Sequence, residues 1–392
     1  MVFYTVYSPT AVTLQEALVK EDVSDLITNL FPLDTPLQQV LSKRPMNNVF
    51  TEQPVDTFTS IVRTTAPFAA SASFATTFAK PENFAYADST PQYPGRLKSV
   101  AEIQGIKFGV SDTDRAISQY GIGDRFAYEA LKTTQTVVNN FEHSFWWSPG
   151  TPPGGADLNT TGGDAQQFAR QTQGLCYWIF KSGLERSRIG ATPGATSNQA
   201  SYTDGHGNEF GTNSVPLGNG AGSWAYNANG IVLDQTMFKE NLMSRWWQLT
   251  GRTGGAVGFA GPKIKALFSQ FSLTANGAIN ERTLDAASKI VVDTVDYYET
   301  DFGVVSLNLC RYLSLASFAP TITLGDSSTP AITSDETLIF IHPRYWQIGV
   351  VRGVSFASYG KTSDGEAGLI RGEQSLVSTN PGGGTGVTNA IP

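Results

Sequence analysis

The chain has 392 residues, of which 40% are hydrophobic and 16% are charged, a balance that fits an ordered protein and argues against a disordered tail. Its net charge of −7 and the absence of any run of Lys or Arg argue against a nucleic-acid-binding surface as its main function. No stretch approaches the roughly eighteen apolar residues of a membrane helix, and the first residues lack the basic region and apolar run of a signal peptide. We therefore expect a soluble, cytoplasmic protein of two or three domains.

The N-terminal part of the sequence predicts an arm followed by two short helices. Residues 1–20 mix Thr, Val, Tyr and Pro without periodicity, which is typical of an extended segment that orders only against another surface. Asp22 to Leu30 has the spacing of a short helix. A second helix begins at Pro36, behind a cap at Asp34 or Thr35. Its inward-facing residues are expected to be Leu37, Val40 and Leu41.

Residues 46–101 show no helical periodicity. Val49 to Val62 has the composition of a strand broken at Pro54, and Ala66 to Pro94 lacks the charges of a disordered linker. So long an excursion is improbable in a compact domain unless it is functional or packs on a partner. We therefore predict a projecting two-stranded loop whose apolar residues contact an adjacent subunit. These residues are Phe58, Ile61, Phe68, Phe74, Phe78 and Phe84.

A strand at Ile103 to Val110 and a short helix capped by Ser111 precede the longest helical pattern, Asp124 to Trp147. At about 1.5 Å per residue this helix is roughly 33 Å long, enough to cross a domain. Asp124 provides its N-terminal cap, and Ser148-Pro149-Gly150 ends it. Its buried stripe is expected at Ala127, Leu131, Thr134, Val138, Phe141 and Phe145.

The second half of the sequence alternates short helices and strands. Helices are predicted at Gln235 to Leu249, capped by Asp234, and at Lys263 to Phe271. Strands are predicted at Ala256 to Ala260, Val304 to Leu313, Thr337 to Ile341 and Trp346 to Val351. The Gly-rich tail, Gly382 to Pro392, is expected to be partly mobile.

The sequence contains no recognisable metal or disulfide site. His143, His206 and His342 lie far apart, and none has a second ligand at zinc spacing. Asp204 to Glu209 has too few acidic positions for a calcium loop and is interpreted as a surface loop with hairpin turns. The only cysteines, Cys176 and Cys310, are predicted to be buried free thiols. We expect no metal and no cofactor.

Catalytic arrangements are also missing from the sequence. Glu142 and His143 are adjacent on a helix, so they point about a hundred degrees apart, which is poor geometry for an acid–base pair. Asp301-Phe302-Gly303 spells the magnesium motif of kinases but lacks the accompanying kinase motifs, so a strand following a turn explains it better. Trp146-Trp147 and Trp246-Trp247 could flank a ligand pocket, although such aromatics more often lie at packing or subunit interfaces. We therefore assign no catalytic residues.

Several segments agree, in collinear order, with one known family. They are Asp25 to Asn29 with Pro32 to Pro36; Glu52, Gln53 and Asp56; Arg96 to Ile103; Val110 to Thr113; Asn140 to Glu142; Arg170 and Gln173 to Leu175; Leu233 to Arg245 with Gly254-Gly255; Tyr297 to Gly303; Asn308 to Arg311; and Lys361 to Gly365 through Glu373, Leu376 and Asn380-Pro381. Together they resemble the major head (capsid) proteins of tailed bacteriophages in the Su-ten-like group. The tryptophan of that family's Glu-Trp-Gln pattern is not kept here, and Gly190 to Gly230 has no recognisable counterpart.

The resemblance implies an α+β chain with the Hong Kong 97-type capsid fold. In that arrangement residues 1–45 form an N-terminal arm with entry helices, and residues 46–101 form the extended loop. Residues 102–150 and 290–345 form a peripheral domain that contains the spine helix, 124–147. Residues 151–289 and 346–392 form an axial domain and the C-terminal segment.

The resemblance also implies a structural function and no enzymatic activity. Copies of the chain would assemble as hexamers and pentamers into an icosahedral capsid around double-stranded DNA, which they enclose without sequence-specific binding. Portal, scaffolding or decoration proteins are the other implied partners, and no membrane is involved. The protein would be assembled in the host cytoplasm and reside in the virion.

Two alternatives remain open at this stage. An encapsulin-like protein compartment has the same fold, and a cargo enzyme in place of packaged DNA would distinguish it. A β-rich glycan-binding module could use the tryptophans and the Gly/Asn loops, and it would remain a small oligomer that binds sugar.

Overall fold

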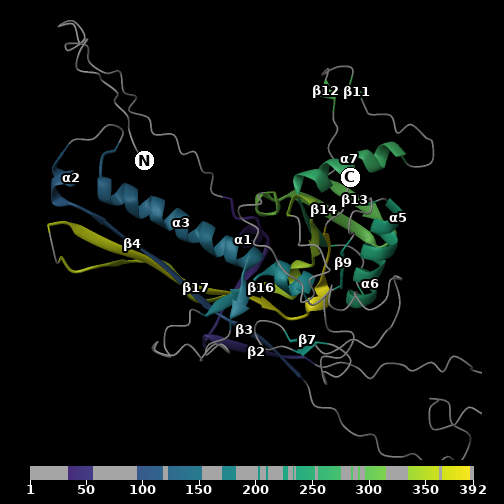
Figure 1. Cartoon of the computed structure of the whole chain (residues 1–392), viewed down its shortest axis with the longest axis horizontal. Coiled ribbons are helices and arrows are strands. Elements are labelled where there is room, and N and C mark those ends of the chain that lie inside the picture. The colour runs from purple at the N-terminus through teal and green to yellow at the C-terminus, as the bar shows by residue number, and fades with distance from the viewer. Residues whose placement is uncertain are drawn as a thin grey trace, which may run out of the picture.

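The computed structural model describes residues 34–55, 95–117, 122–151, 170–181, 202–203, 209–210, 224–227, 233, 235–251, 255–274, 284–285, 290–291, 296–314, 334–361 and 364–388. These residues form an α+β fold with two main sheets, in agreement with the prediction. Figure 1 shows one long helix lying along the first sheet on one side of the molecule, with the helices within residues 235–274 beside the second sheet and the two short helices at residues 36–40 and 112–116 beside the long helix. The predicted helix at Asp22 to Leu30 and residues 56–94 of the loop lie outside the described residues.

The first sheet has four strands in the order β1-β16-β17-β4. They are β1 (Ser42–Pro45), β16 (Trp346–Ser358), β17 (Glu366–Ser378) and β4 (Glu102–Val110). β1 runs parallel to β16, and the other neighbours are antiparallel. β4 confirms the strand predicted from Ile103. β16 extends seven residues beyond its predicted end at Val351, and β17 was not predicted as a strand.

The long helix α3 (Arg125–Trp147) packs on this sheet. Asp124 caps it, because its Oδ1 accepts hydrogen bonds from the backbone N–H of Phe126 at 2.9 Å and of Ala127 at 3.4 Å. The helix and its cap are therefore confirmed.

The predicted stripe of α3 is confirmed at only one end. Phe141 and Phe145 are fully buried, but Leu131 is 61% exposed. The buried residues nearer the start are Thr133 and Val137, each one position before a predicted one. One residue corresponds to a rotation of about 100°, so the first half of the helix presents a different face to the sheet than the sequence pattern suggested.

The second sheet has six strands in the order β13-β14-β10-β15-β18-β9. They are β13 (Tyr297–Thr300), β14 (Gly303–Leu309), β10 (Ala256–Ala260), β15 (Leu338–Ile341), β18 (Gly384–Thr388) and β9 (Trp224–Asn227). β10–β14 and β18–β9 are parallel pairs. All four residues of β15 are buried, because Leu338 and Phe340 face one hydrophobic core while Ile339 and Ile341 face the other. A strand covered on both faces has a continuous apolar sequence, as β15 does.

Helical segments beside this sheet complete the second core. They are α5 (Gln235–Met237), the π-helical η3 (Phe238–Met243), α6 (Ser244–Thr250) and α7 (Pro262–Thr274). The first three make one nearly continuous helix, as predicted, with Phe238, Leu242 and Trp246 fully buried. Gly251 ends it in the left-handed conformation, at a φ of 62° that favours glycine.

The expectation of a mobile tail is wrong for residues 384–388. They form β18, which pairs with β15 on one side and with β9 on the other. Gly384 serves close packing here, because a Cβ added to it would lie 2.9 Å from the Cδ1 of Ile179 and 3.2 Å from the ring of Trp346. Composition alone cannot distinguish a glycine required by packing from one in a flexible segment.

The strands are shared between the two sheets differently from the predicted grouping. The prediction placed residues 290–345 in one domain with residues 102–150, whereas β13, β14 and β15 lie in the same sheet as β10. It placed residues 346–392 in one domain with residues 151–289. In the structure, β16 and β17 lie in the same sheet as β4, and of these residues only β18 lies in the second sheet. The chain crosses between the sheets repeatedly, and the order of segments along the sequence cannot reveal these crossings.

The base of the predicted loop is a two-stranded ribbon of β2 (Phe50–Val55) and β3 (Gly95–Val100), paired antiparallel. The strand is not broken at Pro54, which pairs with Arg96 inside the ribbon. In a two-stranded ribbon the backbone N–H that proline lacks can fall on the unpaired side.

The remaining elements are short: α1 (Pro36–Val40), α2 (Asp112–Ala116), β5 (Pro149–Thr151), β6 (Gln171–Gln173), η2 (Tyr177–Lys181), β7 (Tyr202–Thr203), β8 (Glu209–Phe210), β11 (Leu284–Asp285), β12 (Ile290–Val291), η5 (Arg311–Leu313), η6 (Ser334–Glu336), η7 (Pro343–Tyr345) and η8 (Pro381–Gly383). β7 and β8 pair as the hairpin expected around Asp204 to Glu209.

Candidate assembly surfaces

The root of the N-terminal arm is fixed by a carboxyl group from α3. Thr35 occupies the cap position of α1, but no side-chain cap bond is made there, so the prediction of a cap from Asp34 or Thr35 is wrong. Instead, Oε1 of Glu142 accepts from Leu37 N at 2.7 Å, and Oε2 accepts from Gln38 N at 3.2 Å. The cap is supplied by a residue about a hundred positions away in sequence.

The short 3-10 helix η5 also contacts the junction between α1 and α3. The hydroxyl group of Tyr312 donates to the carbonyl oxygen of Asp34 at 3.1 Å, and Trp147 Nε1 donates to the carbonyl oxygen of Tyr312 at 3.0 Å. Leu37 packs in the main core with Phe141 and Trp146. The point at which residues 1–33 join the described fold is therefore bonded to two other elements.

The base of the extended loop is held by a buried carboxylate. Glu373 on β17 is only 3% exposed and pairs with both Arg170 and Arg352, the latter through Nε at 3.0 Å. Arg170 also donates through its Nε to the carbonyl oxygen of Ala101, directly after β3, at 2.8 Å. Arg170 and Glu373 are 203 positions apart, and the sequence pointed to them only through the family resemblance.

A second carboxyl group, Glu102, joins three elements beside this base. Its Oε1 accepts from Gln104 Nε2 at 2.7 Å and from Ser144 Oγ at 3.1 Å, and its Oε2 accepts from Thr172 N at 3.2 Å. Burial raises the pKa of Glu102, and these donors partly oppose the shift. Strand β4, helix α3 and strand β6 are thereby fixed where the loop leaves the first sheet.

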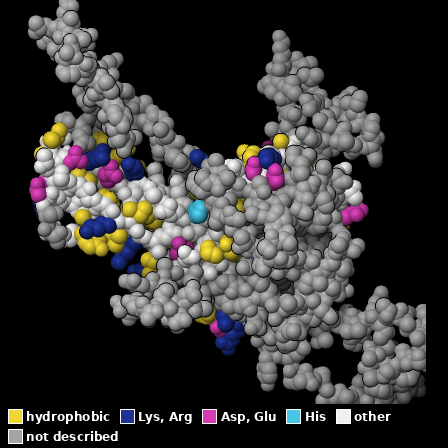
Figure 2. Space-filling view, viewed as in Figure 1, with side chains coloured by type: hydrophobic (Ala, Val, Ile, Leu, Met, Phe, Trp, Pro, Cys, Tyr) yellow, Lys and Arg dark blue, Asp and Glu magenta, His cyan; other side chains and the backbone are white. Residues whose placement is uncertain are grey.

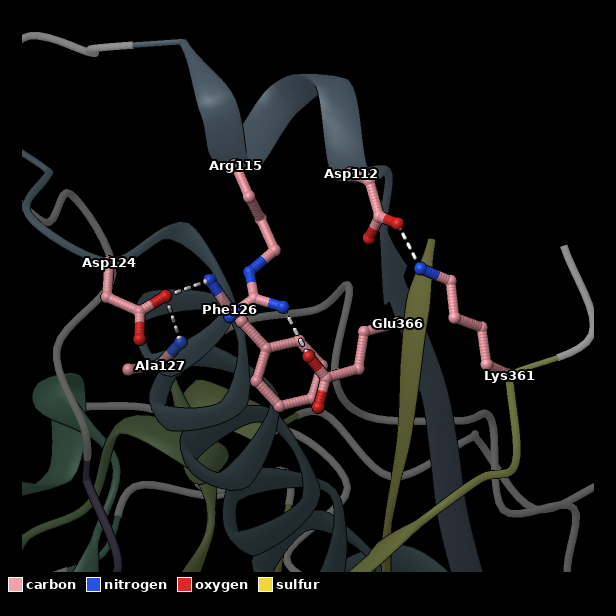
Figure 3. A network of polar contacts seen from close by, with 7 residues as sticks. All are labelled: Asp112, Arg115, Asp124, Phe126, Ala127, Lys361 and Glu366. Atoms are coloured by element: carbon pink, nitrogen blue, oxygen red, sulfur yellow. Dashed lines mark hydrogen bonds and ion pairs between the residues drawn. The ribbon is translucent and has the colours of Figure 1, made fainter. Parts of the chain in front are cut away.

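The far end of the first sheet carries a network of exposed ion pairs, drawn in Figure 3. Arg115 on α2 pairs with Glu366 on β17 at 2.5 Å, and Lys361 pairs with Asp112. The hydrogen bond from Lys361 lowers the pKa of Asp112, and the bond to Asp112 raises the pKa of Lys361. These pairs fasten α2 to the end of the sheet.

Aromatic rings lie beneath this network. The ring of Phe108 lies 5.2 Å from that of Phe126 and 6.3 Å from that of Phe356, measured between centroids. The guanidinium group of Arg115 lies 5.9 Å from the centre of the Phe126 ring. The first turn of helix α3 thus packs in an aromatic cluster with strands β4 and β16.

Because Arg115 and Glu366 are each about 40% exposed, their ion pair should contribute little to stability. We expect Arg115→Glu to lower the free energy of unfolding by no more than about 1 kcal/mol, with a smaller effect at high salt. The charge swap Arg115→Glu with Glu366→Arg should recover part of the loss. Thermal melting at low and high salt measures both, and a loss of several kcal/mol in the single variant would contradict this view of the network.

Large hydrophobic side chains are exposed at both ends of the chain's fold. Ile117 is 60% exposed and Leu131 is 61% exposed near α2, while Tyr297 is 73% exposed and Leu309 is 61% exposed on the second sheet. Figure 2 shows hydrophobic side chains interspersed with Lys and Arg at the α2 end. In an isolated chain these groups face water, so neighbouring subunits have apolar area available to cover.

A groove of about 420 Å³ lies between the outer edge of β4 and helix α3. It is lined by Ile103, Ile106, Val137, Asn140 and His143, among others. Within the described residues, no strand pairs with this edge of β4.

The structure shows where the residues considered for catalysis lie. Glu142 lies beneath α1, whereas the half-buried His143 lies beside the ring of Tyr312, with 6.5 Å between the ring centroids. Asp301 lies in the turn between β13 and β14, as expected for a strand following a turn. His206 lies outside the described residues.

Three of the four paired tryptophans belong to the hydrophobic cores. Trp146, Trp147 and Trp246 are fully buried, and Trp247 is partly exposed beside Phe302. Cys176 and Cys310 are both free and buried, which confirms that prediction. Among the described residues, no group of three His, Cys, Asp or Glu side chains could hold a metal ion, and no helix has the length and apolar character needed to span a membrane.

Solved structures with a similar fold include phage capsid proteins. The chain aligns with the cyanophage A-1(L) capsid at a TM-score of 0.60 and 12% identity, covering 96% of this chain and 98% of the other. It aligns with the capsid of empty GTA particles at a TM-score of 0.56 and 10% identity, covering 97% and 98%. It aligns with the capsid of native GTA particles at 0.53 and 11%, covering 96% of both chains. At these identities the likeness establishes the fold, which is the Hong Kong 97-type capsid fold expected from the sequence.

Sequence comparison identifies the family. No curated protein matches the chain. A family profile described as the SU10 major capsid protein matches residues 5–390, nearly the whole length. The chain therefore belongs to the SU10 major capsid protein family and is a structural, shell-forming protein of a bacteriophage capsid.

Proposed function

We propose that copies of this chain assemble as hexamers and pentamers that close into an icosahedral shell around double-stranded DNA. The family match over residues 5–390 is the observation that carries the proposal. Repeated interfaces, each on the order of 1,000 Å² or more, would stabilise the shell through many simultaneous contacts. The net charge of −7 suits a wall that contains DNA without binding its sequence.

The strand pairing suggests which sheet belongs to which domain of the capsid fold. The four-stranded sheet with α3 would be the peripheral domain, and the six-stranded sheet with α5 to α7 would be the axial domain. Residues 1–45 would serve as the arm and residues 46–101 as the extended loop that reaches a neighbouring subunit. The fixed root of the arm and the fixed base of the loop support this assignment, because segments that bind neighbours need rigid anchors.

The proposal includes no enzymatic activity. The carboxyl groups in the fold's interior bind structural partners: Glu142 bonds to the start of α1, and Glu373 pairs with two arginines. Portal, scaffolding or decoration proteins would be the other partners, and assembly would take place in the host cytoplasm.

Light scattering of the purified chain tests whether it associates with itself. We expect hexamers, pentamers or larger closed particles, because the arm and loop have little reason to order in a monomer. A strictly monomeric species at every protein and salt concentration, with residues 46–101 resistant to protease, would contradict the proposal.

A further inference from the structure

Glu142 is a fully buried carboxyl group with no cationic partner among the described residues. Leu37 N at 2.7 Å, Gln38 N at 3.2 Å and Trp146 Nε1 at 3.0 Å donate to it, and the side chain of Gln38 adds a further hydrogen bond. None of the ion pairs among the described residues includes Glu142. Burial of an unpaired carboxylate favours the protonated form, and here it raises the pKa to about 7 although the N–H donors oppose the shift.

Other titratable groups also face this junction. Burial raises the pKa values of Cys310 and Tyr312, and the nearby Glu142 carboxylate adds to both shifts, so these two side chains stay neutral between pH 5 and pH 8. Asp34 lies at the start of α1, and Arg311 precedes Tyr312 on η5. His143 is next to Glu142 in sequence, so its contribution is separated by its own substitution.

We propose that Glu142 is a proton-controlled clamp that docks α1 onto α3 firmly while its carboxyl group is neutral and less firmly once that group is ionised. Docking of α1 would then weaken as the pH rises through neutrality. The clamp itself is a property of the single subunit. Only its consequence for assembly rests on the proposed role of the arm.

The direction of the pH effect on α1 docking follows from the linkage between docking and protonation. When α1 undocks, water reaches Glu142 and its pKa returns to the ordinary value of 4.5 from about 7. Between these values each pH unit makes undocking up to about tenfold easier, because only the docked state holds the proton. The stabilisation from the neutral carboxyl group is fully present below pH 4.5 and is lost as the pH rises through 7.

Hydrogen exchange of the Leu37 and Gln38 amides in unassembled, full-length protein measures the clamp directly. After correction for intrinsic exchange rates, we expect their protection factors to fall on the order of 50-fold from pH 5 to pH 8. In Glu142→Gln the protection should be independent of pH, because the amide still accepts hydrogen bonds but does not ionise. Glu129→Gln on the same helix and His143→Gln should keep the wild-type pH dependence.

A second variant keeps the test decisive if Glu142→Gln fails to fold. Trp146→Phe removes one N–H donor from the carboxylate, so the midpoint of the pH dependence should move to higher pH. Wild-type protection that does not change with pH, a wild-type slope in Glu142→Gln, or an unmoved midpoint in Trp146→Phe would each overturn the clamp. Because no shell is needed for these measurements, their outcome is independent of whether the chain assembles.

Discussion

Replacing Phe141 by Asp should prevent the subunit from folding. Phe141 is fully buried, stacks on Phe145 with ring centroids 6.1 Å apart, and packs where a Cβ added at Gly372 would lie 3.0 Å from its ring. Loss of a buried aromatic ring costs about 3–5 kcal/mol, and burial of an unpaired carboxylate adds to this cost. The sum is comparable to the whole stability of a typical domain, about 5–15 kcal/mol. Soluble expression and circular dichroism measure the loss.

Leu131→Asp on the same helix is the matched control. Leu131 is 61% exposed, so the variant should fold with a free energy of unfolding within about 0.5 kcal/mol of the wild type. The sequence pattern alone placed Leu131 and Phe141 on one buried stripe and predicts that both variants unfold the protein. Equal damage from the two substitutions would contradict the observed orientation of α3.

Replacing Thr64 to Tyr93 by a short Gly/Ser linker should leave the subunit folded and abolish the shell. The ribbon of β2 and β3 that closes the loop lies outside the replaced segment, and it is held by the bonds from Ala101 N to Val49 O and from Arg170 to Ala101 O. Shortening the loop changes the closure entropy by only about 1 kcal/mol. Circular dichroism, thermal melting and sedimentation of the same sample measure folding and assembly separately.

A Gly/Ser segment of unchanged length is the control for this replacement. It keeps the reach of the loop but removes Phe68, Phe74, Phe78 and Phe84, so it too should fold without forming shells if those side chains contact a neighbouring subunit. Unfolding of the subunit by either replacement would mean that the loop belongs to the subunit's own core.

Local features of the fold could be predicted from the sequence because they depend on neighbouring residues. The cap at Asp124, the ends of α3 and the burial of Phe141 follow from helix geometry within a few turns. The face that the first half of α3 presents could not be predicted, because an apolar residue such as Leu131 has the same spacing whether it faces its own sheet or a partner.

Features that depend on distant residues were missed. β17 carries charges at Glu366, Arg371 and Glu373, which weaken its strand pattern, although Glu366 and Glu373 find cationic partners on other elements. Glu142 could not be recognised as the cap of α1, because its partners Leu37 and Gln38 lie about a hundred positions earlier in the sequence. Only the collinear family resemblance carried information over such distances, and it led to the correct fold and family.

Electron microscopy of the purified full-length protein tests the central claim most directly. The account predicts closed, hollow particles of uniform size, together with free hexamers or pentamers, whose walls fit the two-sheet subunit with α3 lying along the first sheet. Only dispersed single subunits or small irregular oligomers, under conditions where the chain is folded by circular dichroism, would contradict it.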